Sequence, residues 1–287
     1  MRTLLVGSTG FIGSQIKNDL SESDHNFFCL DRNQIDFLKK DSVKALSKHI
    51  DKDTKIIFCT GIKKQHGDTV INWKKNETIT QNLVFALHES APAHLLYLSS
   101  AAVYGEDTNF FGKINEHTEK KGSSFYGISK ISAENALAKT GSSLGFPVSI
   151  VRPPLIYGIG DTTLGYGPTG FCNSAITGTE ITVWGDGKER REFITVEDLA
   201  KICTALSTRS HDGVVNAVSG RSRTFLDLIE IIKTNGFENL KIRHKPRTKE
   251  KVHHDFDAKM LIDAIGDYNF VSQEDGIRAM LSALEKG

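Results

Sequence analysis

The sequence has little net charge and no long hydrophobic run. Among its 287 residues, 36 Lys and Arg oppose 35 Asp and Glu, which leaves a net charge of +1. Because a protein that binds nucleic acid usually carries a basic excess, we expect no nucleic-acid partner. A disordered chain combines low hydrophobicity with high net charge, whereas 39% of these residues are hydrophobic. The composition therefore predicts a globular protein with one or two domains.

Signals for secretion, membranes and metals are also missing. No stretch approaches the ~20 consecutive apolar residues that a membrane span needs. The amino terminus lacks the apolar segment and the cleavage site of a signal peptide. The 4 cysteines are widely spaced, without a CxxC pair or a nearby histidine at metal-ligand spacing. We therefore expect a cytoplasmic protein with reduced thiols, no metal ion and no membrane partner.

Short apolar runs alternate with amphipathic segments in the first part of the chain. The expected strands are residues 3–6, 27–30, 55–58, 95–98 and 148–151. Between them lie segments with helical spacing, such as Ile12, Ile16 and Leu20, whose side chains share one helix face. Strands separated by helices imply right-handed crossovers and a parallel sheet covered on both sides. The pattern therefore predicts an α/β fold.

A glycine loop at residues 7–13 follows the first expected strand and opens the first expected helix. In such a loop the glycines let the backbone turn tightly, bring a diphosphate to the amino end of the helix, and pack helix against strand. The strand before it and the helix after it are the context that the motif requires. The loop predicts a Rossmann-type doubly wound parallel sheet with a dinucleotide cofactor. The expected cofactor-binding residues of the loop are Gly7, Thr9, Gly10, Phe11, Ile12 and Gly13.

Asp31 and Arg32, at the end of the second expected strand, bear on the identity of the dinucleotide. A carboxylate at the position of Asp31 can accept hydrogen bonds from the adenosine ribose hydroxyls, as is typical of NAD sites. The adjacent guanidinium of Arg32 can meet the 2′-phosphate of NADP instead. The expected cofactor is therefore NAD or NADP, and both residues are candidates for binding it.

Ser100, Tyr126 and Lys130 form the candidate catalytic group. A Tyr and a Lys four residues apart stand one above the other on a helix, so that the ammonium can lie near the phenol ring and the cofactor ribose. A phenol normally titrates near pH ~10, and a nearby Lys cation with an oxidised nicotinamide favours phenolate and lowers that pKa. We expect Tyr126 to act as a general acid or base while Ser100 hydrogen-bonds the same substrate oxygen.

Together these motifs resemble the extended short-chain dehydrogenase/reductase family, in its nucleotide-sugar branch of epimerases, dehydratases and reductases. Residues 7–13 resemble the cofactor loop, residues 99–105 the serine motif and residues 126–130 the catalytic pair. Asn76 resembles the structural asparagine that helps to order the family's lysine at the cofactor site. Residues 152–158 resemble a further family segment, but Leu155 stands where the family usually has Asn. One substrate or backbone hydrogen bond of the family is therefore in doubt.

The second half of the chain resembles the family at residues 184–187 and 191–199. This likeness implies that Arg191, together with Arg247 in the basic run 241–251, clamps the diphosphate of a nucleotide sugar. It also implies that Ser100 and Ala101 contact the substrate, and that the protein is a homodimer. His66, in the loop after residues 55–58, is a lesser candidate for contact with the sugar.

The resemblance also implies two domains. We expect residues 1–165 to form the dinucleotide-binding Rossmann domain and residues 166–287 to form mainly a smaller C-terminal substrate-binding lobe. Glycines crowd residues 158–170, which is typical of a loop or hinge between two such parts. Part of residues 190–220 is expected to return to the Rossmann domain.

The type of reaction is narrowed by Ala101 and Ala102, which stand where the family's dehydratases carry an Asp-Glu acid pair. These alanines cannot move a proton, so a dehydratase is not expected. Residues 30–37 resemble the matching segment of the reductases of 4-keto-6-deoxy sugars, and the chain is shorter than most epimerases. By contrast, Asp31 and residues 99–105 resemble the 4-epimerases. We expect the reductase and keep the epimerase as the alternative. A non-catalytic sensor that binds dinucleotide is a more distant alternative. Family members of that kind tend to have lost the Tyr or the Lys, whereas this chain has both.

Overall fold

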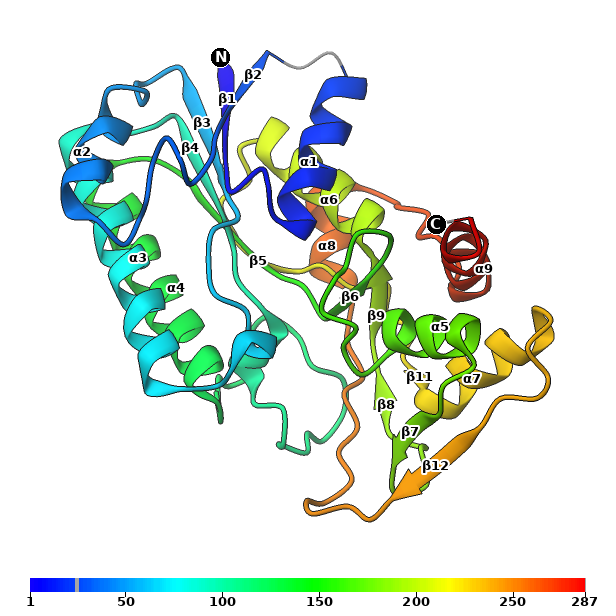
Figure 1. Cartoon of the computed structure of the whole chain (residues 1–287). Helices are drawn as coiled ribbons and strands as arrows, with labels where there is room; N and C mark the ends of the chain where they lie inside the picture. The colour runs from blue at the N-terminus through cyan, green and yellow to red at the C-terminus, as the bar shows by residue number, and fades with distance from the viewer. Residues whose placement is uncertain (24–25, 287) are drawn as a thin grey trace.

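The computed structural model describes residues 1–23 and 26–286 and has a six-stranded parallel sheet at its centre, with strand order β10-β5-β4-β3-β1-β2 (Figure 1). The strands are β1 (Arg2–Val6), β2 (Phe27–Leu30), β3 (Thr54–Phe58), β4 (His94–Leu98), β5 (Val148–Arg152) and β10 (Gly213–Asn216). They read as nearly continuous apolar runs because both faces of the sheet are covered. The strands expected from the sequence, and the α/β fold with its Rossmann-type sheet, are confirmed.

Helices cover both faces of this sheet (Figure 1). On one face lie α1 (Phe11–Glu22), α6 (Val196–Thr208) and α8 (Lys259–Ile265), and on the other α2 (Lys40–Ser47), α3 (Val70–Glu89) and α4 (Phe125–Leu144). Successive strand residues alternate between the two cores: Leu5 and Ile57 pack towards α1 and α6, whereas Leu4 and Ile56 pack towards α3. Burial of these fully covered side chains is the main stabilising contribution to the sheet.

The chain order of the strands determines where a ligand can bind. From β1 the chain passes to β2 on one side, and it then crosses to β3 on the other side of β1. The carboxyl ends of β1 and β3 therefore diverge at a topological switch point, where open α/β sheets bind their ligands. Two short 3-10 turns, η1 (Lys64–His66) after β3 and η2 (Ala101–Tyr104) after β4, lie at this same edge.

The second half of the chain builds a smaller layer beside that edge. It contains α5 (Pro168–Thr177), α7 (Phe225–Thr234) and α9 (Gln273–Leu284), with the strand pairs β6 (Leu155–Tyr157) and β9 (Phe193–Thr195), β7 (Ile181–Trp184) and β12 (Ile242–Lys245), and β8 (Arg190–Arg191) and β11 (Arg223–Thr224). Phe171, Phe193 and Phe225 lie at the centre of its separate core. The basic run 241–251 begins as β12, in parallel register with β7.

Two segments of this half return to the central sheet: α6 packs on α1, and β10 extends the sheet beside β5. The division into domains at residue 165 stays a proposal. Within the described residues, no helix has the length and apolar character that a membrane crossing requires. The cytoplasmic location stays a prediction.

Candidate active site

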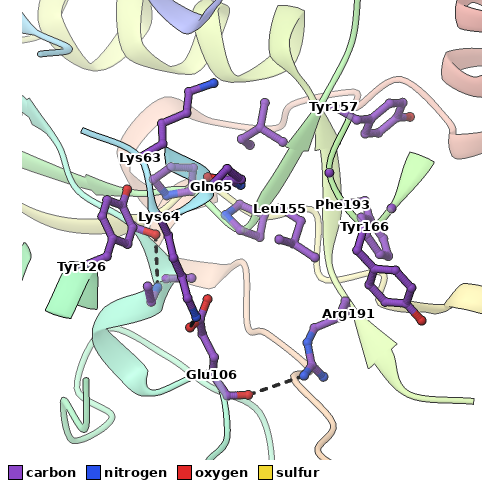
Figure 2. Close-up of a pocket in the computed structure, with 18 of the residues that line it drawn as sticks. Lys63, Lys64, Gln65, Glu106, Tyr126, Leu155, Tyr157, Tyr166, Arg191 and Phe193 are labelled. Carbon is purple, nitrogen blue, oxygen red and sulfur yellow. Dashed lines mark hydrogen bonds and ion pairs between the residues drawn. The ribbon is translucent and has the colours of Figure 1, made fainter. Parts of the chain in front are cut away.

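A cavity of about 830 Å³ lies between the carboxyl edge of the sheet and the second layer. The residues that line it come from the glycine loop, η1, the turn after β4, α4, β8 and the basic run. Figure 2 shows Lys64 of η1, Tyr126 of α4 and Arg191 of β8 among them. Of the residues expected at the site, the following line this cavity: Gly10, Phe11, Ile12, Gly13, Ser100, Ala101, Tyr126, Lys130, Arg191 and Arg247. The fold thus brings together candidates from opposite ends of the sequence.

The glycine loop packs tightly at the start of α1. A Cβ added to Gly13 would lie 2.1 Å from the carbonyl oxygen of Gly7, so no other residue fits there without backbone movement. Gly10 precedes α1 and supplies no side-chain cap to its first turn. The backbone N–H groups of that turn can therefore bind an anion in the cavity. Gly7 and Thr9 shape the loop but are not among the residues that line the cavity.

Asp31 is engaged in its own turn after β2. Its Oδ1 atom accepts hydrogen bonds from the backbone N–H groups of Asn33 at 2.8 Å and Gln34 at 3.2 Å. Arg32 and Asn33 line a separate hollow of about 520 Å³ with Asp36 and Lys39. The carboxylate typical of an NAD site and the cations typical of an NADP site thus lie side by side.

The helix α4 carries Tyr126 and Lys130, the candidate catalytic pair. Its first turn is capped by Ser124, whose Oγ accepts from the N–H of Gly127 at 3.0 Å. Gly127 packs so closely on η2 that an added Cβ would lie 2.6 Å from the carbonyl oxygen of Ala102. This close approach brings Tyr126 near Ser100, whose side chain acts on the pKa of the phenol and whose Oγ accepts from the N–H of Ala102 at 3.2 Å.

Burial dominates the electrostatics of Tyr126. It raises the pKa of the phenol to about 12, and the hydrogen bond from Ser100 offsets only part of this rise. Within the chain alone, the expected lowering of this pKa is therefore not found. The reason is geometric: the Nζ atom of Lys130 lies 5.8 Å from the ring centroid of Tyr126 and donates instead to the carbonyl oxygen of Leu98 at 2.7 Å.

Asn76 lies behind the cavity on α3 rather than in its wall. Its Nδ2 atom donates to the carbonyl oxygen of Ile62 at 3.1 Å, and its Oδ1 atom accepts from the N–H of Ile62 at 2.8 Å. These two bonds hold the loop after β3, where Gly61 approaches both Asn76 and the ammonium of Lys130. Asn76 therefore orders the wall beside Lys130.

Arg191 and Arg247 reach the cavity from different segments and share one carboxylate. Arg191 forms an ion pair with Glu189, and Nη2 of Arg247 lies 2.6 Å from Oε2 of the same residue. The Nε atom of Arg247 is buried and has no hydrogen-bond partner within the part of the chain that the structure describes. Two guanidiniums against one carboxylate leave a net positive charge that fits an anion such as a diphosphate.

Apolar side chains line the cavity at Ala101, Ala102 and Leu155, the positions where the resemblance raised the question of polar residues. Ala101 and Ala102 line the cavity after Ser100 and can neither donate nor accept a proton through their side chains. Leu155 in β6 also lines it, and its side chain is exposed to the cavity. The side chain of Leu155 has no donor or acceptor. It therefore cannot form the substrate or backbone hydrogen bond that its presence put in doubt.

The sequence reasoning missed two lysines in the wall of the cavity. Lys63 lies between the glycine loop and the second layer, with Nζ 4.9 Å from the ring centroid of Phe11 and 4.0 Å from Oδ1 of Asp161. Lys64 forms an ion pair with Glu106 below Tyr126 (Figure 2). His66, the lesser candidate for contact with the sugar, is not among the residues that line the cavity. The position of these lysines, in the loop that follows β3 at the switch point, is the sequence feature that could have predicted their place in the cavity wall.

The model of the NAD dependent epimerase/dehydratase family matches residues 3–218. This match spans the glycine loop, Ser100, Tyr126, Lys130 and Arg191, and it ends before the basic run that holds Arg247. It therefore covers the central sheet and the end of the cavity at the glycine loop.

Comparison with individual proteins extends the likeness over nearly the whole chain. GDP-mannose 3,5-epimerase 1 of Oryza sativa subsp. indica is 23% identical over 305 residues, covering 97% of this chain and 80% of its own. The UDP-glucose 4-epimerase of Thermus thermophilus, solved in complex with NAD, has a TM-score of 0.85 at 21% identity, covering 98% of both chains. RMD from Pseudomonas aeruginosa, solved with NADPH, has a TM-score of 0.87 at 24% identity, covering 99% of both chains. At these identities the structural matches show a shared fold.

Proposed function

Because the chain belongs to the NAD dependent epimerase/dehydratase family, we propose that it is an NAD(P)-dependent oxidoreductase that acts on a nucleotide sugar. The reaction proposed is reduction of a 4-keto-6-deoxy sugar at C4. The observation that carries this proposal is the cavity that joins the glycine loop, Tyr126 and the pair of Arg191 and Arg247. A dinucleotide, a reacting oxygen and a diphosphate each have suitable groups in that one space.

The amino end of α1 fits the diphosphate of the dinucleotide. Gly10 leaves the first-turn N–H groups without a side-chain cap, and Gly13 allows the helix to pack against the loop. Lys63 adds a cation beside the ring of Phe11 at this helix end. When bound, the nicotinamide of the cofactor supplies a hydride. The residues proposed here hold the cofactor with backbone amides and one flanking ammonium.

Tyr126 is the proposed general acid. A phenol whose pKa is raised to about 12 is protonated at neutral pH, so Tyr126 can give its proton to a carbonyl oxygen as that oxygen gains electrons. Ser100, whose side chain acts on the pKa of Tyr126, is proposed to hold the same oxygen in place. This protonation state supports the reductive direction, in which the residue begins as an acid.

The diphosphate of the substrate is proposed to bind between Arg191 and Arg247. Their shared partner Glu189 holds the two guanidiniums close together before substrate arrives. The buried Nε of Arg247 then finds in a phosphate oxygen the acceptor that the described part of the protein does not supply. The ion pair of Lys64 and Glu106 lies nearer to Tyr126 and is proposed to contact the sugar (Figure 2).

NADPH is the reductant that we propose. The hollow lined by Arg32 and Lys39 lies at the end of β2, where the adenosine ribose of a dinucleotide is expected. Two cations there can bind a 2′-phosphate, and Asp31 already uses one carboxylate oxygen in its own turn.

A 4-epimerase with retained NAD is the second candidate. It is favoured by the UDP-glucose 4-epimerase named above, which shares the fold over 98% of both chains and was solved with NAD. In an epimerase the same Tyr126 removes a proton in the first half of the reaction and returns it in the second. This role requires the bound cofactor to lower the pKa of the phenol from its value in the chain alone.

The test of the function uses Tyr126→Phe, which removes the phenolic hydroxyl and keeps the ring. Purified protein is incubated with NADPH and a panel of UDP-, dTDP- and GDP-linked 4-keto-6-deoxyhexoses, and NADPH oxidation is followed by absorbance. We expect the variant to lose a factor of ~10²–10⁴ in kcat because general acid catalysis contributes about that much. Tyr268→Phe, which removes a hydroxyl bonded to Asp198, is the matched control, since neither of these residues lines the cavity.

Three results would revise the proposal. Turnover by Tyr126→Phe at the wild-type rate contradicts its role as the acid. Interconversion of UDP-glucose and UDP-galactose by protein with bound NAD, without NADPH consumption, replaces the reductase with the epimerase. Binding of dinucleotide with no turnover of any sugar in either assay leaves a sensor.

Two expectations about organisation remain proposals. Residues 1–165 are proposed to bind the cofactor and residues 166–287 to contribute mainly to the substrate side. The homodimer is proposed from the family resemblance, and Ile71 and Phe85 on α3 and Ile128 on α4 are exposed apolar side chains available to an interface. Light scattering of the purified protein tests it, and a monomer at micromolar concentration contradicts it.

A further inference from the structure

The ammonium of Lys130 is held by β4 rather than by Tyr126. Its Nζ atom donates to the carbonyl oxygen of Leu98 at 2.7 Å and to the hydroxyl oxygen of Tyr97 at 3.1 Å. The same atom lies 4.6 Å from the ring centroid of Tyr97, compared with 5.8 Å for Tyr126. Tyr97 therefore supplies both an acceptor and the nearer aromatic face to this cation.

Tyr97 is rigidly placed and does not line the cavity. It is the next-to-last residue of β4, only 4% of its surface is exposed, and its ring stacks on Phe58 at 6.4 Å between centroids. Burial raises the pKa of its phenol well above the ordinary value, so the hydroxyl stays neutral. Tyr97 can thus contact Lys130 but not a substrate, and it cannot replace Tyr126 as the acid.

Within the described residues, the other ionisable groups around Lys130 form no hydrogen bond with its ammonium, although the charge of Glu134 raises the pKa of Lys130. They are Cys59 at the end of β3, Tyr126 and Glu134 on α4. Burial raises the pKa of Cys59 to about 12, which keeps that thiol neutral. Glu134 is bound to Arg152 at 2.7 Å and to Ser99 at 2.6 Å. Among the described residues, no carboxylate lies within ion-pair distance of Lys130, so neutral acceptors stabilise this buried cation.

We propose that Tyr97 is a positioning residue that keeps Lys130 protonated and directs its remaining N–H group towards the cavity. This proposal rests on the role in cofactor binding proposed for Lys130. Because Lys130 is buried, loss of the Tyr97 hydroxyl leaves an ammonium N–H without an acceptor and disfavours the charged form.

The direct test is the pKa of Lys130, which burial lowers to about 8 in the native chain. Titration of the cofactor-free protein by ¹⁵N NMR of the lysine Nζ atoms measures it, with the signal assigned by its loss in Lys130→Met. Tyr97→Phe keeps the ring and removes the acceptor, and we expect it to lower this pKa by about one unit, a tenfold change in the proton affinity of Lys130. Tyr268→Phe, which removes a hydroxyl from a different hydrogen bond, should leave the titration unchanged.

A second replacement covers the case in which Tyr97→Phe does not fold. 3-Fluorotyrosine in place of Tyr97 keeps the ring and the hydroxyl but weakens its oxygen as an acceptor, so the pKa of Lys130 should fall by a smaller amount. A titration unchanged by both replacements overturns the proposal. These measurements need no substrate, so they are independent of whether the protein is a reductase.

Turnover supplies the functional readout. In Tyr97→Phe we expect the alkaline limb of the kcat profile to move to lower pH by about one unit, with the substrate KM unchanged. In the Lys130→Met background the same change should have no further effect on kcat, because Tyr97 acts through Lys130. If Tyr97→Phe lowers kcat in the Lys130→Met background by the same factor as in the wild type, Tyr97 does not act through Lys130. That result contradicts the proposal whatever the titration shows for the pKa of Lys130.

Discussion

The two ends of the cavity offer different groups to an anion. At the proposed cofactor end, the amino end of α1 offers backbone N–H groups, which Gly10 and Gly13 make accessible. At the other end, Arg191 and Arg247 are charged side chains from separate segments, held together by Glu189. A site built from the backbone depends on steric fit, whereas a site built from side chains depends on charge. Each should therefore fail under a different perturbation.

The largest expected effect is at the backbone end. Gly13→Ala places a Cβ 2.1 Å from the carbonyl oxygen of Gly7, which only movement of the loop can relieve. We expect a loss of ~100-fold or more in dinucleotide affinity, since strain of about 3 kcal/mol corresponds to that factor. Fluorescence titration with NADPH, with a melting curve to verify folding, measures it.

Gly10→Ala is the matched control in the same loop, because its added Cβ lies 3.5 Å from Gly7, an ordinary contact. A much smaller loss of affinity is expected there. If the two variants bind NADPH equally well, the steric fit of the glycine loop does not determine the affinity for the dinucleotide.

A smaller effect is expected at the side-chain end. Arg247→Met removes a guanidinium from the cavity, and UDP, GDP or dTDP should bind about 10- to 100-fold more weakly, the value of a hydrogen bond to a charged group. NADPH affinity should change little. Calorimetric titration of both ligands provides the comparison.

Arg243→Met is the control from the same basic run, since Arg243 pairs with Glu180 outside the cavity. Equal weakening of nucleotide binding by both variants would mean that the run acts through its overall charge. Added salt should also weaken the binding of UDP, because the arginines act through charge.

The smallest effect expected is a pH dependence confined to the cofactor end. Burial lowers the pKa of Lys130 to about 8, so its positive charge is present below that pH and is lost as the pH rises through it. NADPH binding should weaken roughly tenfold or less from about pH 7 to about pH 9. Arginines stay charged throughout this range, so UDP affinity should stay flat. An equal pH response of both ligands would remove the distinction between the two ends.

Local patterns in the sequence predicted the central sheet and the family well. The strands, the glycine loop and the spacing of Tyr126 and Lys130 depend on neighbouring residues, and both the sheet and the family membership are confirmed. The contacts of Lys63, Lys64 and Glu106 were not predicted, because they join loops that meet only at the carboxyl edge of the sheet.

The electrostatics were predicted less well than the geometry. Spacing placed Lys130 near Tyr126 but could not show that β4 takes up two of its N–H groups. Burial, which depends on the whole fold, raises the pKa of Tyr126 to about 12. The direction of a pKa shift therefore required the tertiary structure.

The sequence by itself determined the sheet, the glycine loop and the identity of the candidate acid, because each follows from a periodicity or motif within one segment. The tertiary structure alone decided which charges share the cavity and which residue holds Lys130. These contacts join segments far apart in the chain, such as Glu189 and Arg247, and their energies depend on burial. Spacing along a sequence carries no information about either.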